Sequence, residues 1–412
     1  MLTQLGINAK NAKKSLGCAS TALKDKALEA VAAALIENTQ AILVANEKDI
    51  EEAKANGMAD SMLDRLRLNE ARIAGMASGV RDIIALPDPC GRVISGANRP
   101  NGLRIEKVSV PLGVVAVIFE ARPNVTADAA ALCLKSGNVV ILRGGKEAYN
   151  SNKAICDTLR SAVKTVGLDE NCIQLVSDTS RESATALMRM NDYVDVLIPR
   201  GGAGLIKACV NNATVPVIET GVGNCHIYVD KTADIGMAVN IIYNAKVSRP
   251  SVCNACESLV IHRDIAKEAL PAIKAKLDTA GVIIHADEFA ATVIDGTVPA
   301  TEEDYAKEYL GYEISIKTVA SFEEAVEHID TYSTRHSECI ITSDYANAQR
   351  FLDRIDAAAV YVNSSTRFTD GGEFGFGAEI GISTQKLHAR GPLGLPELTT
   401  VKYLIRGDGQ IR

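Results

Sequence analysis

The sequence contains no tryptophan, and aromatic residues make up only 4% of its 412 positions. A platform of stacking aromatics for single-stranded nucleic acid is therefore not expected. The net charge is −7, and no stripe of lysine and arginine runs along the chain, which argues against nucleic-acid binding. Long apolar runs are also missing. The longest, 108–119, is interrupted by Pro111 and Gly113 and is too short to span a membrane.

The N-terminus lacks the apolar core of a secretion signal, so we expect a cytoplasmic protein. Its ten cysteines are scattered, and most lie in apolar patterns, as Cys133 does within 130–134. Such cysteines usually serve as small buried hydrophobic residues. This pattern argues against a disulfide framework and for a reducing compartment. Cys253 and Cys256 have no second pair of ligands at zinc-site spacing, so no bound metal is expected.

The composition, with 47% hydrophobic and 23% charged residues, is that of a globular protein with two or three domains. Helical spacing of apolar residues predicts helices through 1–85. Alternating apolar and polar residues predict a β-hairpin over 93–110. A strand-like segment at 398–405 has no obvious neighbour, so it needs either that hairpin or another subunit as its partner.

From residue 113 onward, strand-like and helical segments alternate. Continuous apolar runs predict strands that are covered on both faces, at 114–118, 139–142, 172–176, 194–198 and 215–218. Helices are predicted between them at 126–136, 150–166, 181–189 and 203–211. A second region predicts strands at 259–261, 282–284, 314–319, 339–341 and 360–362 and helices at 264–278, 321–330 and 344–354. The pattern predicts a doubly wound parallel sheet with ligands at the carboxyl ends of the strands, followed by a second α/β domain.

Cys253 and Glu219 are the first candidates for catalysis. Cys253 lies in a polar segment just after Pro250, which predicts a loop that leads into a helix, where the thiolate would be stabilised. A buried structural cysteine is the alternative. Glu219 ends an apolar run 34 residues before Cys253 and is expected in the ligand crevice, with an exposed charge at a strand end as the alternative. A thiol and a carboxylate so placed suit attack on an aldehyde or an activated acid.

Two glycine pairs are candidates for phosphate-binding turns. They are Arg143-Gly144-Gly145-Lys146, after the run 139–142, and Arg200-Gly201-Gly202, after the run 194–198. Glycine lets the backbone approach a phosphate, and the helix that follows attracts anions. Neither turn has the G-x-G-x-x-G spacing of an ordinary dinucleotide fold, and plain tight turns are the alternative. The adjacent arginine and lysine suit a phosphorylated ribose.

Three segments, together with these turns, Glu219 and Cys253, resemble a known family. The segments are 119–126, 249–254 and the stretch 319–340, which contains Thr334-Arg335-His336-Ser337-Glu338. Over essentially its whole length, the chain resembles the gamma-glutamyl phosphate reductase family of the aldehyde dehydrogenase superfamily. The resemblance implies an α/β fold with two doubly wound parallel-sheet domains and a small β oligomerisation element. The implied parts are an NADPH-binding domain at 1–92 and 111–227, a catalytic domain at 228–370, and an oligomerisation hairpin and C-terminal strand at 93–110 and 388–412.

The resemblance also implies roles for individual residues. Cys253 matches the nucleophile, Glu219 the catalytic carboxylate and Asn124 the amide that stabilises an oxyanion. Cofactor-binding roles fall on Arg143, Gly144, Gly145, Lys146, Arg200, Gly201, Gly202 and Glu308, and substrate-binding roles on Arg122, His336 and Ser337. Lys146 stands where members that prefer NAD often carry glutamate, which implies NADPH.

The implied reaction is the NADPH-dependent reduction of L-glutamate 5-phosphate to L-glutamate 5-semialdehyde with release of phosphate, a step of proline biosynthesis. It would proceed through a thioester on Cys253. A homo-oligomer is expected, and functional coupling to a glutamate 5-kinase is a further expectation. The alternatives are another acyl-activated reductase, such as a CoA-acylating aldehyde dehydrogenase, and a non-catalytic binding protein on the same fold.

Overall fold

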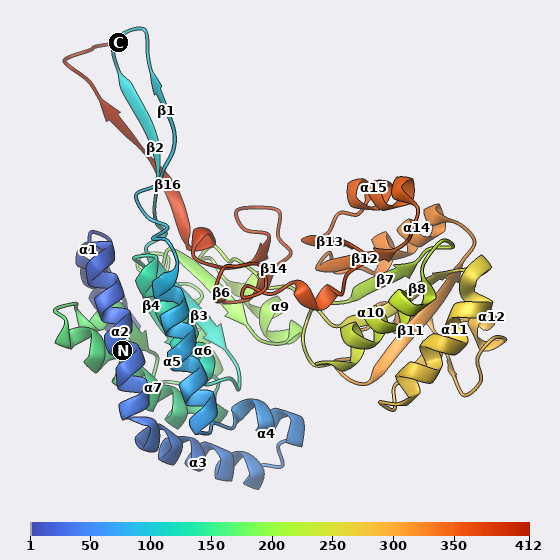
Figure 1. The fold of residues 1–412 in the computed structure, drawn as a ribbon. Coiled ribbons are helices and arrows are strands. Elements are labelled where there is room, and N and C mark those ends of the chain that lie inside the picture. The colour runs from blue at the N-terminus through green and yellow to red at the C-terminus, as the bar shows by residue number, and fades with distance from the viewer. Residues whose placement is uncertain (1) are drawn as a thin grey trace. The chain divides into compact units, whose positions relative to one another are not determined.

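The chain forms two compact units in a computed structural model that describes residues 2–412 (Figure 1). Unit 1 comprises the chain up to Thr220 together with two returning segments, Gly375–Gly381 and Pro392–Arg412. Unit 2 comprises Gly221–Phe374 and Ile382–Gly391. Both units are built from parallel strands and helices, which confirms the predicted α/β fold with two parallel-sheet domains.

The sheet of unit 1 has four parallel strands in the order β5-β4-β3-β6. The strands are β3 (Val114–Phe119), β4 (Val139–Arg143), β5 (Ile173–Leu175) and β6 (Val196–Arg200). All of β3 is buried, as expected for a strand with both faces covered. The strand predicted at 215–218 is only an isolated bridge between Val217 and Leu197. Pro216 has no N–H group with which to extend a ladder.

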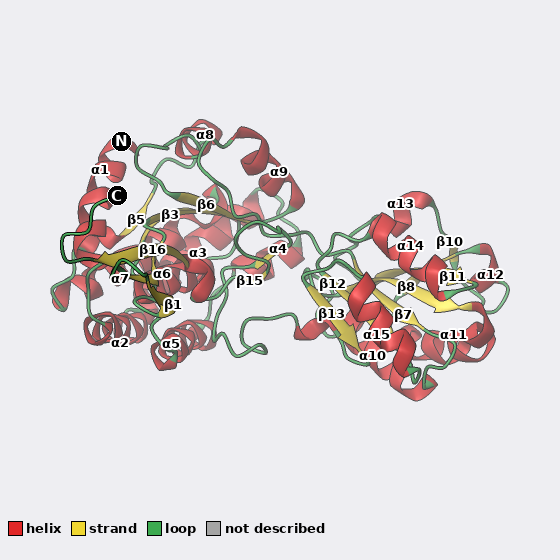
Figure 2. Ribbon diagram, turned by 90° about the horizontal axis from the view of Figure 1, so that it is seen from above, coloured by secondary structure: helices red, strands yellow, loops and turns green. Residues whose placement is uncertain are grey.

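Helices cover both faces of this sheet (Figure 2). They are α1 (Leu2–Leu16), α2 (Thr21–Glu37), α3 (Thr39–Ala55), α4 (Asp60–Leu66), α5 (Glu70–Ala85), α6 (Asn124–Lys135), α7 (Tyr149–Thr165), α8 (Arg181–Leu187) and α9 (Ala203–Asn212). The helical periodicity read from the sequence is confirmed. On α7, for example, Ile155, Leu159 and Val163 repeat every four residues and are fully buried.

A three-stranded antiparallel sheet, here called the arm, belongs to the same unit. Its strands are β1 (Val93–Asn98), β2 (Arg104–Pro111) and β16 (Thr399–Arg406), with β2 in the middle. The predicted hairpin is therefore confirmed, and of the two partners considered for the strand near the C-terminus, the hairpin of the same chain is the one with which it pairs. Figure 1 shows the arm extending away from the helices of unit 1.

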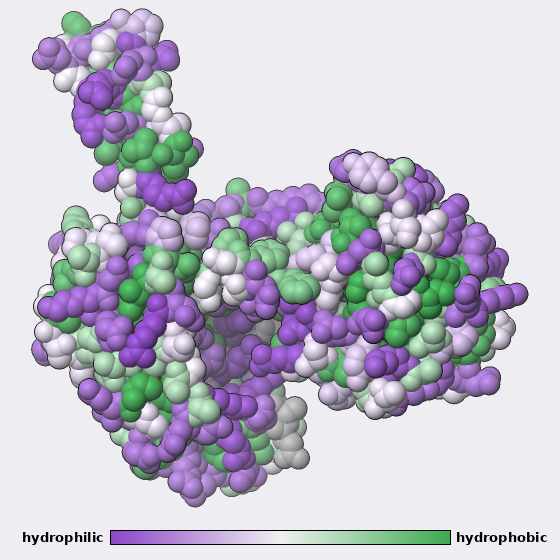
Figure 3. All heavy atoms as spheres, in the orientation of Figure 1, coloured by the Kyte–Doolittle hydropathy of each residue, from purple (hydrophilic) through white to green (hydrophobic). Residues whose placement is uncertain are grey.

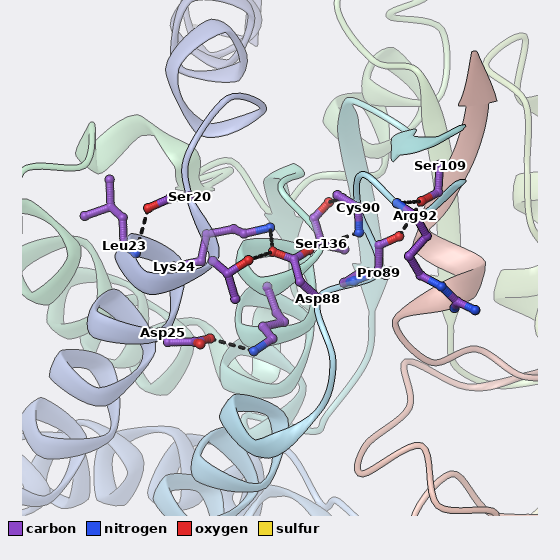
Figure 4. Close-up of polar contacts among 12 residues, drawn as sticks. Ser20, Leu23, Lys24, Asp25, Asp88, Pro89, Cys90, Arg92, Ser109 and Ser136 are labelled. Atoms are coloured by element: carbon purple, nitrogen blue, oxygen red, sulfur yellow. Dashed lines mark hydrogen bonds and ion pairs between the residues drawn. The ribbon is translucent and has the colours of Figure 1, made fainter. Parts of the chain in front are cut away.

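Buried charges fix the segment that leads into the arm (Figure 4). The Lys24 ammonium group pairs with Asp88 at 2.6 Å, and that of Lys135 pairs with Asp25 at 2.6 Å. Both lysine side chains are almost fully buried. Asp88 also accepts a hydrogen bond from the backbone N–H of Cys90 at 3.0 Å. The segment before β1 is therefore anchored to α2, and the second ion pair joins α2 to α6.

Unit 2 holds a seven-stranded parallel sheet in the order β10-β9-β11-β8-β7-β12-β13. The strands are β7 (Cys225–Val229), β8 (Cys256–His262), β9 (Ile283–Ala286), β10 (Val298–Pro299), β11 (Glu313–Val319), β12 (Ser337–Ile341) and β13 (Ala359–Val362). Apolar clusters fill both faces of the sheet, one under α10 to α12 and the other under α14 and α15. The helices are α10 (Ile235–Val247), α11 (Arg263–Asp278), α12 (Glu288–Ala291), α13 (Glu302–Tyr305), α14 (Phe322–Tyr332) and α15 (Tyr345–Arg354).

Short elements complete the chain: the pair β14 (Ile382–Ser383) and β15 (Gly391–Pro392), and the 3-10 turns η1 (Lys146–Ala148), η2 (Glu170–Cys172), η3 (Thr366–Phe368) and η4 (Pro396–Leu398). No helix in the described part of the chain is long and apolar enough to cross a membrane alone. Helices α2 and α3, with a bend of 66° between them, meet that criterion only as a pair.

Candidate active site

Three segments singled out in the sequence meet at one edge of unit 1. Strands β3, β4 and β6 are parallel neighbours, so their carboxyl ends lie side by side. Segments 119–126, 143–146 and 200–202 follow these ends, and helices α6 and α9 begin there. Free backbone N–H groups at the first turn of a helix favour an anion. The carboxyl edge of the unit 1 sheet is therefore suited to bind a phosphate group.

The turn after β4 excludes side chains. A Cβ atom on Gly144 would lie 2.0 Å from Nδ2 of Asn152, and one on Gly145 would lie 2.1 Å from the flexible carboxylate of Glu147. Gly144 is the stricter requirement because Asn152 is buried. Nδ2 of Asn152 has no hydrogen-bond partner among the described residues, which leaves a buried donor beside this turn.

The two cations of this turn differ in their contacts. Arg143 is half-buried and donates from one guanidinium nitrogen to the carbonyl oxygens of Thr179 at 2.6 Å and Ser180 at 2.9 Å. Burial lowers its pKa below the usual value. Lys146 is exposed and forms no ion pair with another described residue. Arg143 thus braces a neighbouring loop, and Lys146 is the cation that remains available to a ligand.

Glu120 directly follows β3, and its side chain reaches the turn after β6, a contact that was not predicted from the sequence. Its carboxylate accepts a hydrogen bond from the N–H of Gly202 at 2.9 Å, just before α9 begins. A Cβ atom on Gly201 would lie 2.5 Å from the same carboxylate. Arg200 ends β6 beside them. Glu120 lies within a segment that carried the family resemblance, but no sequence signal indicated its contact with a turn 82 positions away.

Asn124 and Arg122 follow the carboxyl end of β3. Asn124 is the exposed first residue of α6, and its Nδ2 donates to Asp128 at 2.9 Å. Burial raises the pKa of Asp128 to about 6, despite that hydrogen bond. Arg122 is half-buried. The oxyanion role of Asn124 and the substrate-binding role of Arg122 stay predictions.

Glu219 lies in unit 1, half-buried, between two residues that are tied to β6. The N–H of Ile218 donates to Leu197 at 2.9 Å, and the Thr220 hydroxyl donates to Pro199 at 2.8 Å. These bonds fix the backbone on both sides of the carboxylate. The part that Glu219 plays in catalysis stays a prediction.

Cys253 lies in unit 2 within a segment that we call the thiol loop, residues 248–255, between α10 and β8. The expectation that a helix follows Cys253 is wrong. Residues 256–262 form β8, which pairs with β7 and β11 inside the sheet, so strand pairing decides the local structure. Stabilisation of the thiolate by a helix N-terminus is therefore withdrawn.

Exposure separates the four cysteines of this unit. Cys225, Cys256 and Cys339 are buried, whereas Cys253 is half-buried. Burial raises the pKa of Cys225 and of Cys256 well above that of an ordinary thiol. These two remain protonated at neutral pH, which favours Cys253 as the nucleophile. Among residues 2–412, no group of three or more His, Cys, Asp or Glu side chains could hold a metal ion.

Gly223 joins Cys253 to Glu308. A Cβ atom on Gly223 would lie 1.4 Å from the carbonyl oxygen of Cys253, so only glycine lets the two backbones meet. The N–H of Gly223 donates to a carboxylate oxygen of Glu308 at 2.7 Å. The predicted nucleophile and one predicted cofactor ligand thus share a neighbour, which sequence spacing did not indicate. The only sequence signal was the glycine pair of the Glu-Thr-Gly-Val-Gly motif.

The segment 319–340, which carried the family resemblance, contacts the start of β7 through residues near its C-terminal end. His336 and Ser337 are fully buried, and His336 Nδ1 lies 2.8 Å from the Ser337 hydroxyl. His336 Nδ1 is also 3.7 Å from the thiol of Cys225, which donates to the carbonyl oxygen of Cys253 at 3.1 Å. The two side chains therefore reach the thiol loop through Cys225. Their expected contact with substrate stays a prediction.

Comparisons with known proteins agree with this arrangement. The family model described as the aldehyde dehydrogenase family matches residues 7–290 and 288–402. A gamma-glutamyl phosphate reductase from Lachnospira eligens is 60% identical over 411 residues, covering 100% of this chain and 99% of the relative. One from Clostridium perfringens (strain SM101) is 60% identical over 407 residues, covering 99% and 98%.

Solved structures extend the likeness to three dimensions. The crystal structure of gamma-glutamyl phosphate reductase from Thermotoga maritima has a TM-score of 0.97 and 49% identity, covering 100% of this chain and 99% of that one. An acetylating aldehyde dehydrogenase from Geobacillus thermoglucosidasius has a TM-score of 0.71 and 18% identity, covering 100% and 97%. The second likeness concerns the fold alone.

Proposed function

The chain belongs to the aldehyde dehydrogenase family, and we propose that within it the chain is the reductase of L-glutamate 5-phosphate, the gamma-glutamyl phosphate of its relatives' name. The product is L-glutamate 5-semialdehyde, with release of phosphate, a step of proline biosynthesis. One structural observation carries the proposal: the backbone of Cys253 packs against Gly223, and Cys253 is half-buried while Cys225, Cys256 and Cys339 are buried.

The chain's own groups account for the acyl transfer. The thiolate of Cys253 attacks the acyl carbon, the bond from carbon to the phosphate oxygen breaks, and inorganic phosphate leaves. A thioester remains on Cys253. After reduction, the bond from carbon to sulfur breaks, and the aldehyde and the thiolate are released. The backbone N–H of Cys253 and, by resemblance, the amide of Asn124 are the proposed donors to the oxyanion.

The reductant of this family is a nicotinamide cofactor, and we propose NADPH for this chain. The carboxyl edge of the unit 1 sheet fits such a group, because Gly144 excludes a side chain and Asn152 keeps a buried donor without a partner. The exposed Lys146 would meet the 2′-phosphate, and the first turn of α9, which follows Gly201 and Gly202, would meet the pyrophosphate. When bound, the cofactor supplies the hydride that reduces the thioester.

Two alternatives have less support. An acetylating aldehyde dehydrogenase shares the fold with this chain at 18% identity, whereas relatives that are about 60% identical over its full length are named for the phosphorylated substrate. A non-catalytic binding protein would have no need to keep one thiol accessible beside Gly223.

The test is the reverse reaction: reduction of NADP by glutamate semialdehyde, measured with and without inorganic phosphate. Strict dependence on phosphate is expected. Equal turnover with coenzyme A in place of phosphate would support the acylating alternative, and no turnover with either would support a binding protein.

We also propose a cytoplasmic homo-oligomer that receives its unstable acyl phosphate from a glutamate 5-kinase. The cytoplasm is supported by ten free cysteines, most of them buried. The arm, with exposed strands on either side of β2, supports the oligomer. Coupling to a kinase follows from the chemistry, since an acyl phosphate hydrolyses readily in water.

A further inference from the structure

A buried ion pair closes the base of the thiol loop. Lys246 lies in the last turn of α10, just before the loop, and Glu257 is the second residue of β8, just after it. The Lys246 ammonium group contacts one carboxylate oxygen of Glu257, and both side chains are 0% exposed. The ion pair therefore joins the two ends of the segment that carries Cys253.

Stability is a poor explanation for this pair. Removing two charges from water offsets most of what their attraction contributes, and apolar residues of similar volume often serve a fold equally well. Burial raises the pKa of Glu257 to about 7, even though Lys246 acts in the opposite direction. Folding thus disfavours the carboxylate form that the ion pair needs, so a purely stabilising role is unconvincing.

The second carboxylate oxygen of Glu257 contacts the segment 308–310, which carries the expected cofactor residue Glu308. It accepts a hydrogen bond from the N–H of Leu310 at 3.3 Å. Leu310 has a φ of 56°, a left-handed conformation that a leucine seldom adopts without support from its surroundings. Two positions earlier lies Glu308, whose carboxylate accepts a hydrogen bond from the N–H of Gly223.

These contacts link the residues in a closed series. The backbone of Cys253 packs against Gly223, and the N–H of Gly223 donates to Glu308. Leu310, two positions later, donates to Glu257, whose ion pair with Lys246 returns to the base of the thiol loop. Every member of the series belongs to unit 2. A change at Glu257 therefore acts on the nucleophile and on the expected cofactor glutamate together.

We propose that Lys246 and Glu257 are positioning residues, which set the thiol of Cys253 and the carboxylate of Glu308 in one fixed relation. The proposal rests on the roles given above to Cys253 and Glu308. Neither Lys246 nor Glu257 touches the reacting atoms in this account. Each acts through the loop that it anchors.

The decisive variant replaces both charges with unbranched apolar side chains, K246M together with E257M. If the pair serves packing alone, this variant keeps the wild-type rates. If the pair positions the loops, it folds with a similar melting temperature, but kcat falls by about a hundredfold and the KM for NADPH rises, because small displacements at a reacting centre are costly. K274M, which breaks the more exposed ion pair of Lys274 with Asp278 on α11, is the matched control and is expected to change neither value.

A second measurement does not depend on reductase activity. Iodoacetamide alkylates Cys253 at a rate that reports the accessibility and reactivity of its thiol. This rate is the difference between the chain and its C253A variant. The rate is expected to change several-fold in K246M/E257M and in E257Q, and to stay unchanged in K274M. E257Q keeps the shape of the side chain. If the double variant does not fold, the alkylation rate of Cys253 in E257Q therefore tests the positioning role.

The outcomes separate the two proposals. A wild-type rate of alkylation in both variants would overturn the positioning role, whatever the reductase assay shows. An altered rate in a chain that lacks phosphate-dependent turnover would keep the positioning role and overturn the proposed reaction.

Discussion

Cys253 and Cys256 are close in sequence but have opposite surroundings. Cys253 is half-buried in the thiol loop, whereas Cys256 is buried in β8, where burial raises its pKa. We expect Cys253→Ala to abolish turnover and to leave folding and NADPH binding intact, because no other accessible thiol lies in the loop. Cys256→Ala should keep most of the activity. Steady-state rates and cofactor titration check both variants, and the opposite pattern would move the nucleophile to Cys256.

Gly223 makes the closest backbone approach to the nucleophile, and Gly223→Ala tests it. The added Cβ would meet the carbonyl oxygen of Cys253, which cannot rotate away. We expect a loss of about 1–3 kcal/mol in unfolding free energy from overpacking. Turnover should fall by about a hundredfold because the thiol is displaced.

A matched control lies in the same unit. A Cβ on Gly236 in α10 would have its nearest neighbour at 3.4 Å. Gly236→Ala should be neutral or should stabilise the helix by up to about 1 kcal/mol. Denaturant titration and turnover distinguish the two variants, and equal behaviour would mean that the Gly223 turn can shift without consequence.

Lys146→Glu tests the proposed cofactor preference. A carboxylate at this exposed position would face the 2′-phosphate, so binding of NADPH should weaken by about 1.5–3 kcal/mol while binding of NADH changes little. Lys26→Glu, on the exposed face of α2, is the control for charge alone. An unchanged ratio of the two cofactors' kcat/KM values would place the phosphate elsewhere, with Arg143 as the next candidate.

The individual residues show what a sequence can and cannot supply. The glycine turns were recognisable because each follows an apolar run, and Cys253 because its segment is polar. The contacts of Glu120 with Gly202 and of Gly223 with Cys253 were not recognisable, because they join segments far apart in sequence. Such contacts depend on the spatial order of the strands in each sheet, which the sequence pattern does not show.

At the scale of elements, strong periodicity was a sound guide and weak periodicity was not. Helix α11 and strand β11 are close to the ranges predicted from the sequence. Strand β7 and helix α10 were missed. Strand β7 contains the polar residue His226, which interrupts its apolar run, and α10 carries apolar residues on most of its faces, so no helical stripe stands out. The thiol loop was assigned to a helix start for a related reason: tertiary pairing of β8 overrides the local signal.

One carboxylate of unit 2, that of Asp356, pairs with two cations of the tail segment Ile382–Gly391. Asp356 pairs with Lys386 at 2.5 Å, with Arg390 at 2.8 Å and with Arg335 at 3.4 Å. Asp356→Asn should release this segment, so that trypsin cleaves after Lys386 and Arg390 several-fold faster. Asp353→Asn, on the exposed side of α15, is the control, because Asp353 accepts only from Gln349. Equal digestion of the two variants would contradict this role of Asp356.

The same contact predicts a pH dependence. Hydrogen bonding to Lys386 and Arg390 lowers the pKa of Asp356 from 3.8 to about 2. A carboxyl group whose folded pKa is lowered contributes stability above its unfolded pKa and loses it as the pH falls through the folded pKa. The protection of amides within 382–391, taken as the exchange rate relative to that of an unstructured peptide at the same pH, should therefore decrease between about pH 4 and pH 2. Protection that stays constant over this range would contradict a stabilising role for these ion pairs.

At the scale of the whole molecule, the arm is the feature least able to stand alone. Val93, Ile94, Tyr403 and Ile405 are more than half exposed on it, and Figure 3 shows hydrophobic atoms among hydrophilic ones there. The outer edges of β1 and β16 have no partner strand among the described residues. Three strands without a covering layer are marginal in water, so a second copy of the chain is the expected partner.

We expect sedimentation to show at least a dimer for the intact chain. A chain ended at Pro396, which lacks β16, should lose assembly. Ile405→Lys keeps the strand but charges its exposed face and should weaken association, whereas Lys402→Arg should not. A monomeric intact chain, or a truncated chain with unchanged mass and activity, would contradict an assembly role for the arm.

The pairing of β2 with β16 also forms late during synthesis of the chain. Arg406 contacts Glu106, 300 positions earlier in the chain. During synthesis β2 leaves the ribosome with one edge open, and that edge stays open until residues 399–406 have been made, tens of seconds later at about 5–20 residues per second. The nascent chain therefore carries the two-stranded part of the arm with one unpaired strand edge, while both parallel sheets are already able to form. An unpaired strand edge is a template for pairing with another chain, so β2 is the part of the nascent arm most exposed to mispairing until residues 399–406 have been made.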